Sequence, residues 1–470
     1  MKKRTLLLGG ICGIALAIFA GLSGKSWLKT AEKHPLSQTQ DSMTTSPIMV
    51  QELKTNLGKP VWFVPTNIPV ISLSLTFRNA GDRSSPTDLP GLTDLIAALL
   101  DEGAGPYDSQ SFKKVLLEKN ISLSVSSSQD NFTITFRTIK ENIKDALELI
   151  KLILSSPRFA DEDMRRVKEQ MIAGLQQSLH HPQPIAKEEL QKRLLGENHP
   201  YFKRTLERIK ILPTIQAEQL RAQIKKNFTL ANLEIVACGN TDTTELIQSL
   251  EKTLGDLPKG DSVPSPTPTD LQNLGKTFNV ALDIPQSLIF FAHPGVSRQD
   301  PDFYALFLAA RILGSGNFES RLWNEIREKR GLAYFCNLDL FTNDLAFGMI
   351  GATATKTETL EETLSVIKQE WKNLIEKGIT QEELDFHKKN IMGSFPLSFG
   401  STLETVSALG RYRQDDLPID YVQKRNLYFG ALTVEDINRV IKRVLHPELL
   451  TFIIVGRSEA KADEKRADAK

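Results

Sequence analysis

The sequence of 470 residues has little cysteine and almost no net charge. Its 58 lysines and arginines nearly balance 57 aspartates and glutamates, so the formal charge is +1. This balance gives no electrostatic reason to expect a nucleic-acid partner. The three cysteines exclude a disulfide framework of the kind found in small secreted domains. Cys12 lies in an N-terminal apolar run, whereas Cys238 and Cys336 lie in strand-like apolar segments, which predicts two buried thiols.

Histidine is scarce as well, and its spacing is unlike that of a helical metal site. Two imidazoles share one face of a helix when they lie four residues apart, and no two histidines here do so. His180 and His181 are adjacent and fall in a segment that is typical of a loop. The sequence therefore predicts that this chain binds no metal ion. The seven histidines are His34, His180, His181, His199, His293, His387 and His446.

The sequence has one long uncharged run, and it lies close to the N-terminus. Lys2, Lys3 and Arg4 precede the uncharged segment from Leu6 to Leu22. This pattern is typical of a secretion signal or of an uncleaved membrane anchor. Because basic residues before such a segment stay cytoplasmic, we expect the rest of the chain to be exported. The chain would be periplasmic, or anchored in the inner membrane and facing the periplasm, with no other membrane contact.

A segment rich in proline, serine, threonine and glycine, residues 257–275, divides the chain almost evenly. Each half runs strand, helix, hairpin, long helix, further helices and a final strand. The segment 136–174 has a counterpart in 351–393, displaced by roughly 220 residues, which predicts a duplicated domain. The predicted divisions are a signal peptide or anchor (1–24), a polar linker (25–48), an N-terminal domain (49–256), a linker (257–275), a C-terminal domain (276–460) and a charged tail (461–470).

Alternating side chains predict strands that form a half-buried sheet in each half. Every second residue from Ile71 to Phe77 is apolar, and an apolar face also runs through 121–136 across a turn at 129–131. The predicted fold class is α+β, with an antiparallel sheet in each half and helices packed on one face.

The opposite face of the first sheet carries Ser122, Ser124 and Ser126 and is polar. An edge strand can accept an extended peptide through backbone hydrogen bonds, which predicts a substrate-binding role for this serine face. A solvated sheet face without a function explains the same pattern.

The stretch "PGLTDLIAALLDEGAG" (90–105) predicts a short helix closed by glycine. Asp94, Ala97, Ala98 and Asp101 form a row that faces away from the apolar stripe, and two of these four positions are alanines. The apolar stripe consists of Leu92, Leu95, Ile96, Leu99 and Leu100.

Two motifs carry a resemblance to a known family. They are "FRNAGDRSSPTDLPGLTDLIAALLDEGA" in the first half and "GSGNFESRLWNEIREKRGLAY" in the second. With the duplicated order of elements, they make the chain similar to the pitrilysin and insulinase family of zinc peptidases, in the branch of the mitochondrial processing peptidases and their bacterial relatives. The resemblance extends from about Met49 to Gly456. It implies that the chain forms half of a metallopeptidase clamshell.

The family's zinc motif, H-x-x-E-H, places two imidazole ligands and a general base on one helix. Asp94, Ala97 and Ala98 stand at the corresponding positions of this chain, so the resemblance implies a zinc site that has lost its ligands. The third ligand, a glutamate, should fall at 173–174, which is Ala-Gly here. The nearest carboxylate, Glu169, lies about one helical turn too early.

The motif of the second half is intact. The resemblance implies that Arg327 and Tyr334 reach into a closed chamber and hold the substrate carbonyl as its oxyanion forms. The alternative is structural: Arg327 pairs with Glu328 or another acid, and Tyr334 packs in a strand after a glycine cap at Gly331. The "HPY" of 199–201 also occurs at a comparable place in the family and is interpreted as packing.

These observations lead to one main functional hypothesis. The chain would be the exported, non-zinc-binding subunit of a heterodimeric peptidase. It would supply Arg327 and Tyr334 to a paralogous partner that carries the zinc and the general base. Its substrates would be peptides or short unfolded segments, since an enclosed chamber excludes folded proteins.

Three alternatives stay open at this point. The chain is a catalytically silent peptide-binding or scaffold protein of the same family, or it pairs with a second copy of itself. The third alternative is a lone metallopeptidase with a relocated site, which predicts stoichiometric zinc in the isolated chain.

Overall fold

The structure is a computed structural model that describes residues 48–261 and 266–456. The predicted signal or anchor, Cys12, almost all of the predicted polar linker and the predicted charged tail lie outside the described residues. None of the described helices is both long and apolar enough to cross a membrane.

The first half contains a sheet of six strands in the order β1-β2-β6-β3-β5-β4. Its elements are β1 (Gln51–Lys54), β2 (Pro60–Pro65), β3 (Val70–Phe77), α1 (Leu92–Leu99), α2 (Ser109–Glu118), β4 (Ser122–Ser127), β5 (Phe132–Ile139), α3 (Ile143–Ser155), α4 (Asp161–Ser178), α5 (Pro182–Leu195), α6 (Thr205–Ile211), α7 (Ala217–Asn227), β6 (Leu233–Gly239) and α8 (Thr243–Leu254).

The second half contains a sheet of five strands in the order β7-β11-β8-β10-β9. Its elements are β7 (Thr277–Ala281), β8 (Gln286–Pro294), α9 (Phe303–Ala310), α10 (Arg321–Trp323), the short π-helix η8 (Asn324–Glu328), β9 (Ala333–Thr342), β10 (Phe347–Lys356), α11 (Leu360–Lys377), α12 (Gln381–Gly393), α13 (Thr402–Gln414), α14 (Tyr421–Gly430), α15 (Val434–Val444) and β11 (Thr451–Gly456).

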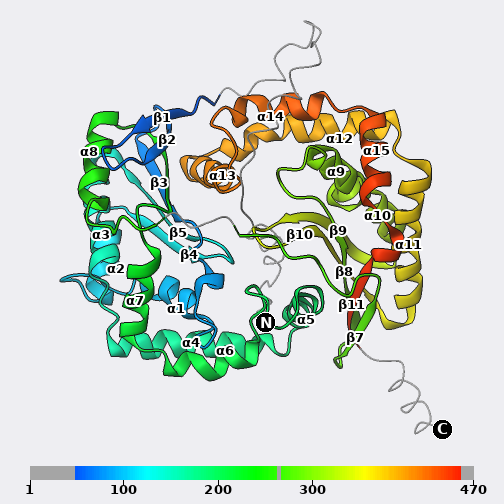
Figure 1. Cartoon of the computed structure of the whole chain (residues 1–470), viewed down its shortest axis with the longest axis horizontal. Helices are drawn as coiled ribbons and strands as arrows, with labels where there is room; N and C mark the ends of the chain where they lie inside the picture. Colours follow the sequence, from blue (N-terminus) through cyan, green and yellow to red (C-terminus); the bar gives the residue numbers. More distant parts are fainter. Residues whose placement is uncertain (1–47, 262–265, 457–470) are drawn as a thin grey trace, which may run out of the picture.

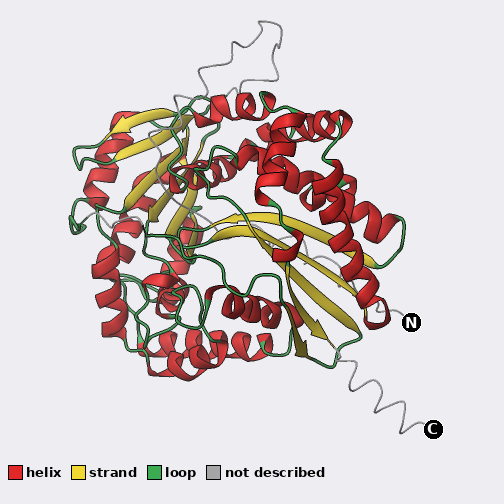
Figure 2. Cartoon of the chain, turned by 45° about the vertical axis from the view of Figure 1, so that its right-hand side comes forward, coloured by secondary structure: helices red, strands yellow, loops and turns green. Residues whose placement is uncertain are grey.

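The two strand orders are the same once β1 is set aside. In both sheets the last strand of the half inserts beside the first long strand, and a hairpin forms the other edge. This agreement confirms the predicted α+β fold with one sheet in each half. The sheets are mixed rather than purely antiparallel, because β2 pairs with β6 and β7 pairs with β11 in parallel. Figure 2 shows most helices as an outer layer around the strands.

Helices begin where short polar side chains bind the free N–H groups of the first turn. Asp242 before α8 and Ser401 before α13 accept from the N–H three residues ahead, and Thr433 before α15 forms a capping box with Asp436. Each of these caps stands just ahead of a helical apolar pattern.

The central strands are apolar on both faces, so each sheet has two buried sides. In β2, Val61 and Phe63 pack into the core under the first half's helices, whereas Trp62 and Val64 point to the opposite side. The same division holds for β11, where Ile453 points away from the helices of its own half. A strand with apolar residues on both faces must be covered twice.

The second cover of each sheet comes from the other half. Helix α5 places Ala186, Leu190 and Leu194 against β8 and β11 of the second sheet. Helix α13 places Val406 and Leu409 against β3 and β6 of the first sheet. The exchange is visible in Figure 1, where α13 lies beside β3 and α5 lies beside β8 and β11. The two helices hold corresponding places in the duplicated order.

The exchange covers part of the first sheet's polar face, which the sequence predicted to be solvated. The side chains of β3 on that face are buried under α13: Ser72 and Thr402 share a hydrogen bond of 2.8 Å between their hydroxyls. Gln414 donates from Nε2 to Thr76 Oγ1 at 3.3 Å. The predicted solvated face therefore survives only toward the β4 edge, because a helix of the other half covers the centre.

Candidate functional site

Helix α1 carries the row of side chains that stands at the zinc-motif positions. Gly91 precedes it with φ of +89°, a left-handed conformation that favours glycine. Asp94, Ala97 and Ala98 are half-buried, and both alanines pack against the core of the first half. Two methyl groups offer no metal-binding atom, so the zinc motif's chemistry is missing from this helix.

The one polar member of the row is already paired. Asp94 forms an ion pair with Arg208, which comes from α6. Burial raises the pKa of Asp94 to about 6; the Asp82 carboxylate adds to this rise and Arg208 opposes it. A guanidinium thus neutralises the carboxylate at the place where the family binds its metal.

The third ligand position is also unsuited to a metal. Ala173 and Gly174 lie exposed on α4, and a Cβ at Gly174 would meet no atom within 4 Å. Within 48–261 and 266–456, no group of three histidine, cysteine, aspartate or glutamate side chains is placed to hold a metal ion. The residues present do not fit zinc.

Arg327 and Tyr334 are brought together by a turn between η8 and β9. The Arg327 guanidinium lies over the Trp323 ring at 4.3 Å and over the Tyr334 ring at 4.7 Å from the ring centroids. Two aromatic rings therefore contact the cation. Tyr334 itself is 79% exposed.

The structural alternative for Arg327 is met in part, because Arg327 forms a long ion pair with Glu328. Its distance to Glu328 is 3.8 Å, and Glu328 instead accepts a hydrogen bond from Trp323 Nε1 at 3.1 Å. Glu325 pairs with Lys329 and Arg330. The Arg327 guanidinium donates no hydrogen bond to any of the described residues. Its N–H edges are therefore available to a carbonyl or carboxylate oxygen.

The serines singled out in the sequence lie on the edge strand of the first sheet. Ser122, Ser124 and Ser126 of β4 are exposed, and the intervening residues face the core side. Strand β4 pairs only with β5 in the described sheet. The arrangement leaves one backbone edge and one polar face toward solvent, as an added strand would require.

Tyr201, which the sequence analysis interpreted as packing, also takes part in a buried polar cluster. Arg83 bridges two carboxylates, with 2.9 Å from Nε to Asp130 and 2.9 Å from Nη2 to Asp344. Tyr201 donates from its hydroxyl to Asp130 at 2.7 Å and accepts from the Leu345 N–H at 2.9 Å. The ring packs as predicted, and its hydroxyl additionally joins the hairpin turns of the two halves.

This cluster is buried and carries more acid than base. The side chains of Asp130 and Asp344 are each 3% exposed. Burial raises the pKa of Asp130 to about 7, with the Asp344 charge as the second cause, and burial also raises the pKa of Asp344. We assign the cluster to the junction of the two halves, since its partners come from both.

The two described cysteines are free and buried, as predicted. Burial raises the pKa of Cys238 to about 11 and that of Cys336 to about 12. Thiols in such surroundings are poor nucleophiles and poor metal ligands at neutral pH.

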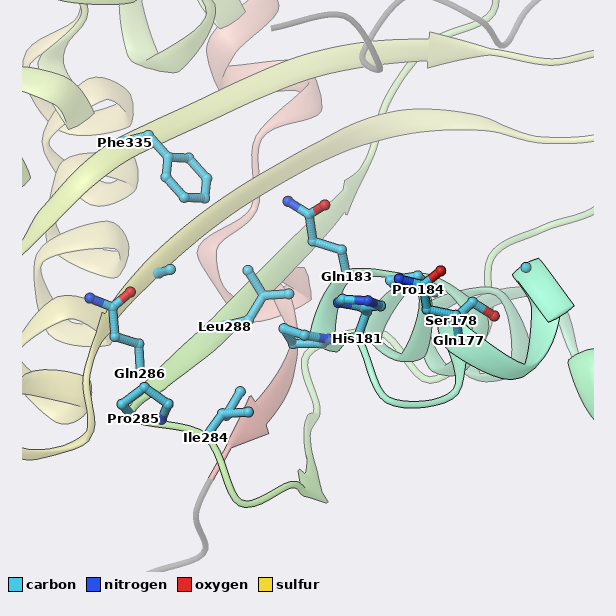
Figure 3. A pocket seen from close by; sticks show the side chains of 13 residues that line it. Gln177, Ser178, His181, Gln183, Pro184, Ile284, Pro285, Gln286, Leu288 and Phe335 are labelled. Carbon is cyan, nitrogen blue, oxygen red and sulfur yellow. The ribbon is translucent and has the colours of Figure 1, made fainter. Parts of the chain in front are cut away.

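A hollow of about 660 Å³ lies between the halves. The last turn of α4 and the first turn of α5 form one wall, and β8, β9 and β10 form the other (Figure 3). Gly174, at the predicted third-ligand position, and Phe335, next to Tyr334, both line it. The hollow thus adjoins both sets of site residues.

Two segments of the chain match known protein families. Residues 69–204 match the family described as insulinase, peptidase family M16, and residues 214–391 match the one described as the peptidase M16 inactive domain. The two segments together span most of the described residues and both halves.

Individual relatives agree with these family matches. The non-peptidase homolog YmxG from Helicobacter pylori is 29% identical over 394 residues, 83% of this chain and 90% of that protein. The beta subunit of the mitochondrial-processing peptidase from Blastocladiella emersonii is 26% identical over 273 residues, 54% of this chain and 56% of that protein. A peptidase M16 inactive domain from Pseudomonas fluorescens superimposes with a TM-score of 0.81 at 27% identity, covering 87% of this chain and 98% of that one.

Proposed function

This chain belongs to peptidase family M16 and lacks the family's zinc ligands, and we propose that it is the non-zinc-binding subunit of a two-chain peptidase. A paralogous partner would supply the zinc and the general base. This chain would supply the wall of the chamber and the side chains of Arg327 and Tyr334.

The main support for the proposal comes from the contacts of the Arg327 guanidinium. Its guanidinium lies over the rings of Trp323 and Tyr334 and makes no hydrogen bond to a described residue, and its ion pair with Glu328 is long, at 3.8 Å. A donor that is held in place before substrate arrives costs little reorganisation when it binds. Arg83, by contrast, contacts two carboxylates at 2.9 Å each.

The chemistry that such a pair can perform is electrostatic. During peptide hydrolysis the scissile carbonyl oxygen gains negative charge, and a cation and a phenol aimed at that oxygen stabilise the transition state. Neither group generates a nucleophile. Bond cleavage therefore depends on the partner, because the α1 positions offer a paired carboxylate and two methyl groups.

Peptides fit this proposal as substrates. An extended segment can add to the free edge of β4 by main-chain hydrogen bonds, which do not depend on sequence. Ser122, Ser124 and Ser126 would then lie beside the bound strand. Selection would follow extended conformation and size more than one side chain.

The test is a mixing experiment with the full chain and its zinc-bearing paralogue. The mixture should hydrolyse a peptide far faster than either chain alone. Arg327→Ala should lower the rate of the mixture by about 10²–10³-fold, the usual loss for one oxyanion donor. Arg330→Ala is the matched control, because Arg330 lies on the same segment and pairs with Glu325. Equal rates for both variants and the unaltered chain would contradict the proposal.

A second candidate function is a catalytically silent peptide-binding or scaffold protein. The relative that is named a non-peptidase homolog favours it. In that case Arg327→Ala would leave hydrolysis by any partner unchanged while still weakening peptide binding. Analytical ultracentrifugation of the chain alone would show whether it pairs with itself.

We also propose that the chain is exported, with Leu6 to Leu22 as a cleaved signal or a retained anchor. Fractionation of cells into periplasm, membrane and cytoplasm tests this directly. Recovery of the chain from the cytoplasm would overturn it.

A further inference from the structure

The hollow between the halves has an unusual lining for a protein surface. None of its thirteen lining residues is an aspartate, glutamate, lysine or arginine, and His181 is the one titratable side chain among them. About a quarter of the residues in the whole chain are charged, at 24%. An uncharged wall does not suit a phosphate or a metal ion, because neither would find a counter-charge or a ligand set.

The polar groups of the lining are mostly primary amides. Gln177, Gln183 and Gln286 make no side-chain hydrogen bond to any residue in the described part of the chain. Each amide offers two N–H donors and one carbonyl acceptor. These are the groups that pair with the N–H and C=O of a peptide main chain.

The amides stand on opposite walls. In Figure 3, Gln183 projects from the start of α5 and Gln286 from the start of β8, with Leu288 between them. Proline neighbours restrict the backbone at both positions, since Pro182 and Pro184 flank one and Pro285 precedes the other. The backbone that carries the two amides is therefore restricted.

The floor of the hollow is apolar. Leu288 and Phe335 come from β8 and β9, and Phe335 directly follows Tyr334 along the chain. The hollow and the Arg327 site therefore share strand β9.

We propose that this hollow, which we call the amide groove, binds an extended peptide segment whose side chains are uncharged and apolar. The amides form hydrogen bonds with its main chain, and Leu288 and Phe335 contact its side chains. A charged side chain would be desolvated there without a counter-charge, so it is disfavoured. The inference rests on the proposed peptide-binding function and adds a substrate class to it.

The experiment uses the full chain and three fluorescein-labelled synthetic peptides. One contains alanine, leucine and glutamine; in the other two the glutamines are replaced by glutamate or by lysine. Fluorescence anisotropy should show the neutral peptide binding at least about tenfold more tightly than either charged one. The double variant Gln183→Glu, Gln286→Glu should weaken the neutral peptide by about tenfold and make the lysine peptide the preferred ligand.

The matched control is Gln248→Glu, which alters an exposed glutamine on α8, away from the amide groove. Equal melting temperatures for all variants would show that they are folded. If the double variant keeps the peptide preference of the unaltered chain while Arg327→Ala weakens all three peptides, the amide groove is wrong and the proposed function stands. If the unaltered chain binds none of the peptides, the proposed function itself fails.

Discussion

The two halves of the chain share one topology but differ in what they offer at their site-bearing helices. In the first half, α1 presents two alanines and a carboxylate that Arg208 occupies. In the second half, Arg327 of η8 lies over the rings of Trp323 and Tyr334 and makes no hydrogen bond to a described residue. A duplicated fold is maintained by its cores, so site residues in one copy can change without loss of the architecture.

The halves also differ in how they receive the exchanged helix. The contact of α5 with the second sheet is almost wholly apolar, through Leu190 and its neighbours. The contact of α13 with the first sheet adds buried polar bonds, such as the one between Ser72 and Thr402. Because apolar contacts tolerate small shifts better than fixed hydrogen bonds do, we expect the first sheet to be the more rigidly held of the two.

The largest expected effect comes from removing the link between the halves. Arg83→Ala leaves Asp130 and Asp344 buried without their shared cation, which should cost about 3–5 kcal/mol in the free energy of unfolding. Urea unfolding measures this loss. Arg137→Ala, at an exposed arginine on β5, is the control. Equal unfolding curves for the two variants would show that the halves are not held by this cluster.

The next effect compares the exchanged helices with each other. Leu190→Ala on α5 and Leu409→Ala on α13 each remove a buried side chain, and each should cost about 2–5 kcal/mol. Leu117→Ala, at a residue that is 80% exposed, should stay within about 0.5 kcal/mol of the unaltered chain. If only one of the two buried variants loses stability in thermal unfolding, the two exchanged helices do not contribute similarly to the stability of the fold.

A smaller effect is a pH dependence at the junction. The folded pKa of Asp130 is raised to about 7, above the usual value near 4 in an unfolded chain. The folded state therefore binds the extra proton, and stability falls as pH rises between about 4 and 7, by at most about 1.4 kcal/mol per pH unit. Above pH 7 this contribution is constant.

Urea unfolding across this pH range checks the prediction. Asp130→Asn should flatten the profile, because the asparagine side chain does not titrate. Asp88→Asn, at an exposed aspartate, should leave the profile as it is. A profile that rises with pH in the unaltered chain would reverse the sign and refute the assignment.

The smallest effect concerns the ion pair between Asp94 and Arg208. Arg208→Ala should change the free energy of unfolding by only about 0–1 kcal/mol, since the pair is partly exposed. Calorimetry of this variant beside Arg83→Ala compares the two arginines directly. A loss as large as that of Arg83→Ala would mean that the pair is a structural requirement.

Much of the fold was predictable because it depends on local periodicity. The alternation in β3 and the repeat of 136–174 in 351–393 indicated strands and duplication correctly. The exchange of α5 and α13 was not predictable, because an apolar stripe shows that a helix is covered but not which sheet covers it. For the same reason the sequence did not show that α13 buries Ser72 on the polar face of β3.

The candidate site, like the fold, was predictable from the sequence only in part. The resemblance to the family predicted that Ala97 and Ala98 stand at zinc-motif positions, and a methyl group cannot bind a metal. The pairing of Asp94 with Arg208 joins residues 114 positions apart, and the role of Tyr201 depends on partners in both halves. Contacts of this kind leave no periodic signal. The weak signal for Tyr201 was a buried aromatic hydroxyl, which needs a partner.

The central claim is that this chain lacks a metal site of its own and acts through a partner. The most direct test is the zinc content of the purified full chain after equilibrium with zinc and dialysis, measured by elemental analysis. The account predicts far less than one zinc per chain and no chelator-sensitive proteolysis by the chain alone. One tightly held zinc per chain would contradict it.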